Sequence, residues 1–283
     1  MKIVILSGKG GTGKSCMTSA IALNIEKCIL VDADVDCPNQ HILFKGNETS
    51  RKQFSASKLA VIGKNEPGEK DYEGICEFGA IKKEEGKIKI IENRCEGCKA
   101  CVIAFPELEI ELIPRNSGEL IVKETEKFPL VYGKLVPGEA GSGKVVFEIK
   151  KIAEKISNEK NIPVTLIDAP AGIGCPVIAA VTGCDYVVGV VEPTPASIAN
   201  VERALEVVKH FNIPYSMVMN KKGISEKYEN EIRKKFKDLV VAEIPYDEEV
   251  PKMLAEGIPP VLGKGEAAKS LKEMAEKINE VVG

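Results

Sequence analysis

The sequence predicts an α/β protein with a mostly parallel sheet flanked by helices, interrupted by a small α+β insert. Towards both ends of the chain, apolar strand-like runs alternate with helical segments, a pattern that favours a parallel sheet covered on both faces. Between about residues 47 and 114, short segments, turn residues and cysteines replace this alternation. We therefore expect one α/β domain from residues 1–46 and 115–283, and a small inserted domain from 47–114.

The first part of the chain has the order strand, glycine loop, helix, strand. Residues 3–6 are a short apolar run typical of a buried strand, and residues 16–27 contain few helix breakers. A second apolar run, residues 28–32, leads into a group of aspartates. In the insert, residues 87–91 and 108–113 read as strands, with charged and apolar side chains alternating.

After the insert, helices and strands alternate again. The expected helices cover residues 145–160, 196–211, 226–237 and 267–282, and the expected strands cover 164–168, 185–191, 214–219 and 239–244. The last helix balances glutamates against lysines and has no aromatic residue. We therefore expect it to pack on the sheet rather than to anchor the protein in lipid.

Composition and charge exclude several classes of partner. The net charge of −3 gives no basis for non-specific nucleic-acid binding. No run of about 18 apolar residues predicts a membrane span, and the first apolar run is too short for a signal peptide. Nine cysteines without an export signal favour thiols and metal ligands over disulfides, and a cytoplasmic location.

A phosphate-binding loop directly follows the first strand. Residues 8–15 fit G-x4-G-K-[ST], in which backbone N–H groups and a helix N-terminus converge on phosphate oxygens. Lys14 would neutralise the β and γ phosphates, and the Ser15 hydroxyl would bind Mg²⁺. The predicted nucleotide site includes Gly8, Lys9, Gly10, Gly11, Thr12, Gly13, Lys14, Ser15 and Cys16.

The base preference follows from one replaced residue. A GTPase would carry Asn-Lys-x-Asp, whose aspartate reads the guanine edge. Residues 220–223 have the asparagine, but Gly223 replaces the aspartate. The sequence therefore favours ATP.

A second glycine-rich run, residues 138–144, also fits G-x4-G-K. Val145 stands where a magnesium-binding hydroxyl is needed, and no further strand-end aspartate is left to serve a second site. We interpret this run as a loop that opens the helix at 145–160.

Four cysteines are typical of a two-cluster ferredoxin that has kept one cluster. Residues 95–106 follow the bacterial run C-x2-C-x2-C-x3-C-P, with Phe105 in place of the fourth cysteine. Cys76 looks like the fourth cysteine of an earlier copy, and in such folds the fourth cysteine of each run ligates the other run's cluster. The sequence therefore predicts one [4Fe–4S] cluster on Cys76, Cys95, Cys98 and Cys101.

The other cluster has lost its whole ligand set. Counting back from Cys76, the positions of the first three cysteines are now Glu66, Glu69 and Tyr72, and the fourth is Phe105. A zinc knuckle is the alternative for the remaining cysteines, since C-x2-C spacing also suits tetrahedral zinc. Zinc gives no reason for a third cysteine at the same spacing or for the proline that ends the run.

The run Lys-Gly-Gly-Thr-Gly-Lys-Ser at residues 9–15 resembles the deviant Walker A loop of the MinD/ParA superfamily. With the cysteine pattern, nearly the whole chain is similar to superfamily ATPases that contain an inserted ferredoxin domain. These are relatives of the nitrogenase iron protein and of iron–sulfur carrier ATPases. The resemblance implies a homodimer that forms on ATP binding and hydrolyses ATP, in which Lys9 reaches the partner's nucleotide.

The same resemblance assigns roles to strand-end residues, which face the nucleotide crevice in parallel sheets. It implies that Asp34 orients the attacking water, that Asp32 and Asp168 support Mg²⁺ together with Ser15, and that the Gly172 amide senses the γ-phosphate. The implied catalytic residues are Lys9, Lys14 and Asp34, and the implied adenine contacts are Asn220, Pro245 and Asp247.

Cys175 lies seven residues after Asp168, the offset of a cluster-bridging cysteine in the nitrogenase iron protein. It is therefore a candidate for a second metal or cluster site, with a small buried residue as the alternative. Cys37 is a lesser candidate. We expect core positions for Cys16, Cys28 and Cys184, and structural roles for His41 and His210.

Three functions are compatible with these features. We favour nucleotide-gated electron transfer or metallocofactor maturation by a slow, partner-stimulated ATPase with ATP, Mg²⁺ and one [4Fe–4S] cluster, acting on an unidentified redox or metallocofactor partner protein. The second function is an iron–sulfur or metal carrier that uses Cys175. The third is a MinD/ParA-type positioning ATPase, which predicts a lipid anchor or a basic DNA-binding face, and the sequence shows neither.

Overall fold

The computed structural model describes residues 1–64, 66–139 and 141–282. The chain forms two compact units, which we call the larger unit and the smaller unit. The larger unit comprises Met1–Lys52, Leu120–Lys134 and Ser142–Gly283, and the smaller unit comprises Gln53–Glu119 and Leu135–Gly141.

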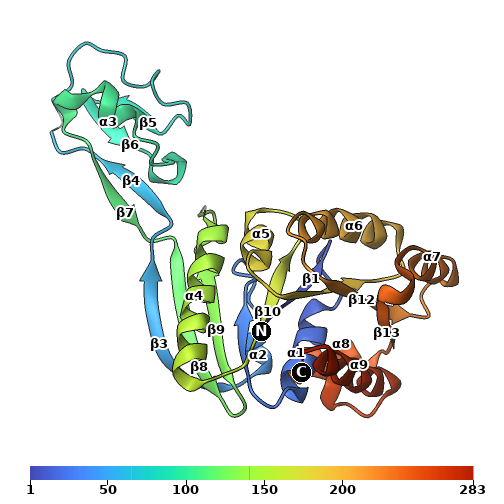
Figure 1. Ribbon diagram of the computed structural model, residues 1–283. Helices are drawn as coiled ribbons and strands as arrows, with labels where there is room; N and C mark the ends of the chain where they lie inside the picture. Colours follow the sequence, from blue (N-terminus) through green and yellow to red (C-terminus); the bar gives the residue numbers. More distant parts are fainter. Residues whose placement is uncertain (65, 140, 283) are drawn as a thin grey trace. The chain divides into compact units, whose positions relative to one another are not determined.

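Helices and strands alternate along the larger unit (Figure 1). Its strands are β1 (Lys2–Ser7), β2 (Cys28–Asp32), β3 (Gly46–Phe54), β8 (Gly118–Thr125), β9 (Pro129–Leu135), β10 (Val164–Ala171), β11 (Tyr186–Val191), β12 (Tyr215–Lys222) and β13 (Val240–Pro245), of which β3, β8 and β9 end or begin in the smaller unit. Its helices are α1 (Lys14–Asn24), α2 (Gln40–Leu43), α4 (Ser142–Lys160), α5 (Cys175–Val181), α6 (Pro195–His210), α7 (Glu226–Phe236), α8 (Glu249–Ala255) and α9 (Glu266–Val282).

The described residues form a nine-stranded sheet in the order β13-β12-β11-β1-β10-β2-β9-β8-β3. Neighbouring strands from β13 to β9 run parallel. This confirms the predicted α/β fold with a mostly parallel sheet.

The expected limits of the insert, residues 47 and 114, differ from the boundaries of the smaller unit. The difference arises because β3 and β8 extend the large sheet, where the Thr49 hydroxyl lies 3.4 Å from the Val122 carbonyl oxygen. The smaller unit therefore begins later, at Gln53, and also includes residues 135–141 on the return path of the chain.

Helices cover both faces of the sheet. Ile3 and Ile5 of β1 pack with Met17 of α1 and Leu271 of α9 in one buried cluster. Helices α4, α5 and α6 contact β2, β10 and β11, and Figure 1 shows them on the other side of the sheet from α1 and α9. The expectation that the last helix packs on the sheet is confirmed. Among the helices of the described residues, none combines the length and apolarity that a membrane span requires.

The smaller unit contains two antiparallel strand pairs and a short helix. β4 (Ser57–Val61) pairs with β7 (Glu111–Arg115), β5 (Ile81–Glu84) pairs with β6 (Lys87–Ile90), and α3 covers Ala100–Ala104. The strand expected at 108–113 begins later than predicted, because Leu108 ends a 3₁₀ turn and Glu109 has a φ of +47°. The core consists of Ala60, Tyr72, Ile81, Ile88, Phe105, Leu108 and Ile110.

Candidate functional site

Residues 8–13 form a tight loop between β1 and α1. Gly13 has a φ of +96°, a left-handed conformation that glycine adopts without strain, and Lys14 then begins α1. A Cβ on Gly8 would lie 2.0 Å from the backbone carbon of Asn200, so glycine is required there. The loop and the α1 N-terminus thus have the arrangement that binds phosphate in other proteins.

Two buried carboxylates lie side by side on neighbouring strands. Asp32 of β2 and Asp168 of β10 are register partners and are 0% and 1% exposed. Burial, reinforced by Asp168, raises the pKa of Asp32 to about 8. Burial also raises the pKa of Asp168, although the Lys14 ammonium opposes that shift. This pair could support a hard cation such as Mg²⁺, whose charge would stabilise both ionised carboxyls.

Most of the predicted nucleotide-binding residues of the loop line one cavity of about 400 Å³. Its walls include Gly10, Gly11, Gly13, Lys14, Ser15, Cys16, Asp34 and Asn39. Burial raises the pKa of the Asp34 carboxyl. Asp34 and Lys14 thus lie on the wall of the same cavity.

A second cavity, of about 310 Å³, shares Gly11, Gly13 and Cys16 with the first. The predicted adenine contacts Asn220, Pro245 and Asp247 line it, together with apolar side chains such as Ile244 and Leu254. The Asn220 amide donates a 2.8 Å hydrogen bond to the Thr12 carbonyl oxygen. The cavity that contains Lys14 and Asp34 thus adjoins one with several apolar side chains, an arrangement that suits the phosphate and base ends of a nucleotide.

Lys9 is not among the residues that line these two cavities. Its ammonium forms a 2.5 Å ion pair with Glu192, which is 4% exposed, and Lys221 contacts the other carboxylate oxygen at 2.7 Å. Lys221 also donates to the Gly11 carbonyl oxygen at 2.8 Å. Burial raises the pKa of Glu192, but the hydrogen bonds from Lys221 and Lys9 outweigh burial and lower it overall.

Sequence reasoning missed Glu192 and Gln40. Glu192 directly follows β11, so the strand-end rule that identified Asp32 could have found it. Gln40 begins α2 and is fully buried, and its side-chain amide donates to Asp168 at 2.7 Å. No sequence signal marked Gln40, because its contact joins residues 128 positions apart.

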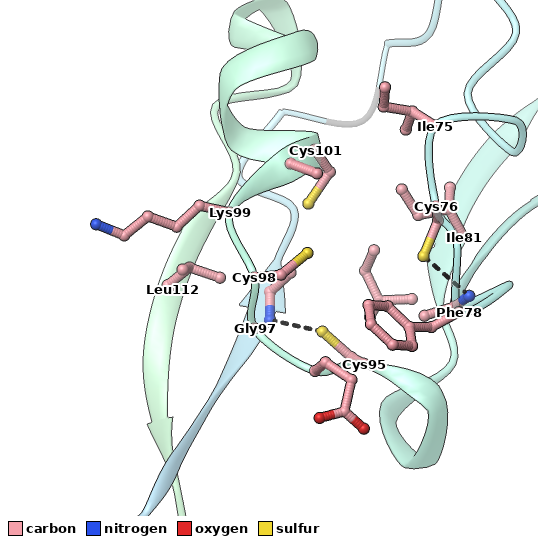
Figure 2. A pocket seen from close by; sticks show the side chains of 15 residues that line it. Ile75, Cys76, Phe78, Ile81, Cys95, Gly97, Cys98, Lys99, Cys101 and Leu112 are labelled. Atoms are coloured by element: carbon pink, nitrogen blue, oxygen red, sulfur yellow. Dashed lines mark hydrogen bonds between the residues drawn. The ribbon is translucent and has the colours of Figure 1, made fainter.

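The smaller unit gathers the four cluster-candidate cysteines around one cavity, and Figure 2 shows their side chains on its two sides. Cys95 and Cys98 come from the segment before α3, Cys101 lies in α3, and Cys76 comes from the loop before β5. The Ala60 and Ala80 amides donate hydrogen bonds to the sulfurs of Cys95 and Cys76, at 3.5 and 3.2 Å. The other cavity residues are mostly apolar and include Ile75, Phe78, Ile81, Ile90 and Leu112.

Within the described residues, no three His, Cys, Asp or Glu side chains are gathered closely enough to hold a single metal ion. The donor set at the cavity is instead four thiols from two segments, with amide donors to two of the sulfurs. Four thiolates are the ligands that a [4Fe–4S] cluster takes, and hydrogen bonds to sulfur tune such a cluster.

The four positions predicted to have lost cluster ligands are now two surface carboxylates and two buried aromatic rings. Tyr72 and Phe105 are 2% and 5% exposed, and their ring centroids lie 4.6 Å apart. Glu66 pairs with Lys64 at 3.1 Å on the surface, and Glu69 is exposed. Tyr72 and Phe105 are therefore part of the apolar core of the smaller unit.

The other five cysteines and the two histidines differ in burial and in their contacts. Cys16, Cys28 and Cys184 are buried, which confirms the prediction of core positions. Cys37 and Cys175 are exposed, so the alternative of a buried Cys175 is wrong. His41 stacks on Tyr132 with a ring separation of 4.8 Å, His210 packs edge-on against Phe211, and burial lowers the pKa of His41.

The parallel sheet, the glycine loop and the strand-end carboxylates define a P-loop nucleotide-binding protein. The chain belongs to the CobQ/CobB/MinD/ParA nucleotide binding domain family, whose model matches residues 3–261.

Two related sequences, MJ0578 and MJ0579, come from Methanocaldococcus jannaschii. The chain is 36% identical to protein MJ0578, over 100% of this chain and 98% of that protein. A 48-residue stretch is 40% identical to the electron transport protein HydN of Escherichia coli, covering 16% of this chain and 27% of HydN.

Solved structures support the fold. The septum site-determining protein MinD from Pyrococcus horikoshii, solved with Mg-ADP, has a TM-score of 0.62 at 18% identity, over 100% of this chain and 97% of that protein. A ParA family ATPase from Chlorobium tepidum has a TM-score of 0.58 at 16% identity, over 97% and 98% of the two chains.

Proposed function

We propose that this protein is a MinD-like ATPase that dimerises on ATP binding, carries one [4Fe–4S] cluster, and uses ATP to gate electron transfer or metallocofactor maturation. The observation that carries the proposal is the presence of both kinds of site in one chain. One is the loop cavity with Lys14 and Asp34, and the other is the four-cysteine cavity.

The nucleotide part of the proposal rests on side chains that suit the phosphates and the Mg²⁺ of a bound nucleotide. Lys14 and the α1 N-terminus would bind the phosphates, and Ser15 and the pair Asp32 and Asp168 would hold Mg²⁺. The MinD structure with the same fold was solved with Mg-ADP. Asp34 would then orient water towards the γ-phosphate from the wall of the same cavity.

Replacing Asp34 with alanine tests the hydrolysis step. We expect Asp34→Ala to bind ATP with near-normal affinity. Its ATP hydrolysis should be at least about 100-fold slower, because the attacking water is no longer oriented. Phosphate release and ATP binding are measured on the same preparation. Asp36→Ala, two residues further on, serves as the control, and unchanged hydrolysis in Asp34→Ala would remove Asp34 from the mechanism.

Dimerisation requires Lys9 to leave Glu192, because the ion pair holds its ammonium on its own chain. We expect Lys9→Ala to bind ATP as a monomer and to lose hydrolysis. Lys221→Ala removes the other cation from Glu192 and should still dimerise. Light scattering with and without ATP measures the mass, and an ATP-dependent dimer of Lys9→Ala is the contrary result.

The cluster part of the proposal rests on the four cysteines and on the local identity with HydN, an electron transport protein. The thiolates of Cys76, Cys95, Cys98 and Cys101 would hold the cluster, which supplies one-electron chemistry when bound. The Ala60 and Ala80 amides would stabilise thiolate charge. Because Cys98 is exposed, the cavity has an edge that a redox partner could approach.

The exposure of Cys175 favours a second candidate, an iron–sulfur or metal carrier. Cys175 begins α5, four residues after the end of β10, and could respond to the nucleotide through that connection. A carrier loses iron to an apo-ferredoxin acceptor during ATP turnover, whereas an electron donor keeps it. Iron analysis of the re-isolated protein separates the two functions.

A further inference from the structure

We infer that Gln40 is a positioning residue for the Mg²⁺–nucleotide site, an inference that rests on the proposed function. Gln40 contacts each of the three residues predicted to support Mg²⁺. Its backbone N–H donates to Asp32 at 2.9 Å, and its side-chain amide donates to the Ser15 carbonyl oxygen at 3.2 Å and to Asp168 at 2.7 Å. One residue thus joins the phosphate-binding loop to both strand-end carboxylates.

The contacts fix the orientation of the Gln40 side chain. Both of its near neighbours, the Ser15 carbonyl and the Asp168 carboxylate, are acceptors, so the NH₂ group must face them. The Gln40 amide oxygen and the second Asp168 oxygen are buried and have no hydrogen-bond partner among the described residues. Gln40 therefore occupies one oxygen of Asp168, which leaves the other oxygen available to a cation or to its water ligands.

The neutral charge of Gln40 matters as much as its hydrogen bonds. Asp32 and Asp168 are buried register partners and repel each other when ionised. An amide can donate to Asp168 without adding charge, whereas a glutamate at position 40 would place a third carboxylate beside the pair. Leucine would remove the donor and keep a similar volume.

Local structure explains why Gln40 reaches this position. Asp32 accepts hydrogen bonds from the backbone N–H groups of Asn39 and Gln40, at 2.8 and 2.9 Å, and so holds the start of α2 against the end of β2. The same carboxylate accepts from the Asp34 N–H at 3.1 Å. The chain from Asp34 to Gln40 is therefore tied at both ends to one side chain, which places the Gln40 amide beside Asp168.

The test measures Mg²⁺ dependence separately from nucleotide affinity. A fluorescent ATP analogue is titrated with Mg²⁺, and its affinity is measured again in EDTA. We expect Gln40→Leu to need about tenfold more Mg²⁺ for half-maximal binding, and Gln40→Glu more still, with the affinity in EDTA unchanged. Gln53→Glu adds the same charge at an exposed position and should match the wild type.

The outcomes separate this inference from the proposed function. If the wild type binds the analogue without any Mg²⁺ dependence, or does not bind it, the proposed function fails. A different outcome is that binding to the wild type depends on Mg²⁺ while Gln40→Leu and Gln40→Glu need the same Mg²⁺ concentration as the wild type. In that case only the proposed role of Gln40 is wrong. Equal losses with and without Mg²⁺ would make Gln40 merely structural and would also overturn the inference.

A second measurement does not depend on the folding of variants. The chain contains two glutamines, Gln40 and Gln53, so selective ¹⁵N-glutamine labelling yields two side-chain NH₂ signals. We expect Mg²⁺ with ADP to shift the Gln40 signal more than ADP alone does, while the exposed Gln53 signal stays in place. A Gln40 signal that does not respond to Mg²⁺ would contradict the proposal.

Discussion

Replacing Lys14 with alanine should abolish measurable ATP binding. Lys14 is 8% exposed, lines the loop cavity and begins α1, so its ammonium can reach phosphate oxygens with little competition from water. Hydrogen bonds between charged groups contribute about 1.5–3 kcal/mol each, and loss of two corresponds to an affinity at least about 100-fold lower. Isothermal titration with Mg²⁺ and ATP measures the loss.

The chain offers a matched control for Lys14. Lys144 ends the second G-x4-G-K run, but it lies on α4 and is exposed. We expect Lys144→Ala to bind ATP like the wild type. Retained affinity in Lys14→Ala would contradict the phosphate-loop assignment, and a loss in Lys144→Ala would point instead to the second run.

Replacing Cys76 with alanine should remove as much iron as replacing Cys98. The two residues belong to different segments, yet both line the same cavity (Figure 2). A [4Fe–4S] cluster needs four ligands, and losing either thiolate leaves three. We expect both variants, purified without oxygen, to lose the visible absorbance of the iron–sulfur cluster and most of the iron that the wild type contains.

Cys37→Ala is the control for the cysteine variants, because Cys37 is exposed and lies in the larger unit. It should keep the iron content of the wild type. A full cluster in Cys76→Ala would show that crossed ligation is wrong and that the cluster uses the segment from Cys95 to Cys101 with another ligand.

The fold class could be predicted from the sequence because the motifs that indicate it consist of residues close together in the chain. The glycine loop after an apolar run, and the alternation of helices and strands after residue 145, predicted a parallel sheet with a phosphate site. The pairing of β3 with β8 was not predictable in this way, because most of the smaller unit lies between the two strands in the sequence. The expected limits of the insert and the boundaries of the smaller unit differ for the same reason.

In the candidate sites, too, the features set by nearby residues could be predicted, and those set by distant residues could not. The spacing around Cys95 and the position of Cys76 predicted four cysteines as one set, and the four line one cavity. The contacts of Gln40 and the ion pair between Lys9 and Glu192 depend on the register of distant strands and on helix packing. A sequence pattern carries neither, so these residues emerged only from the structure.

Iron and acid-labile sulfide per chain, measured on wild-type protein purified without oxygen, test the central claim most directly. About four of each per chain is the predicted result, because one [4Fe–4S] cluster contains that number. About six of each would indicate an additional cluster shared by two chains and would make Cys175 the leading candidate for its ligand. Zinc without sulfide would contradict the account and reduce the four cysteines to a structural zinc site.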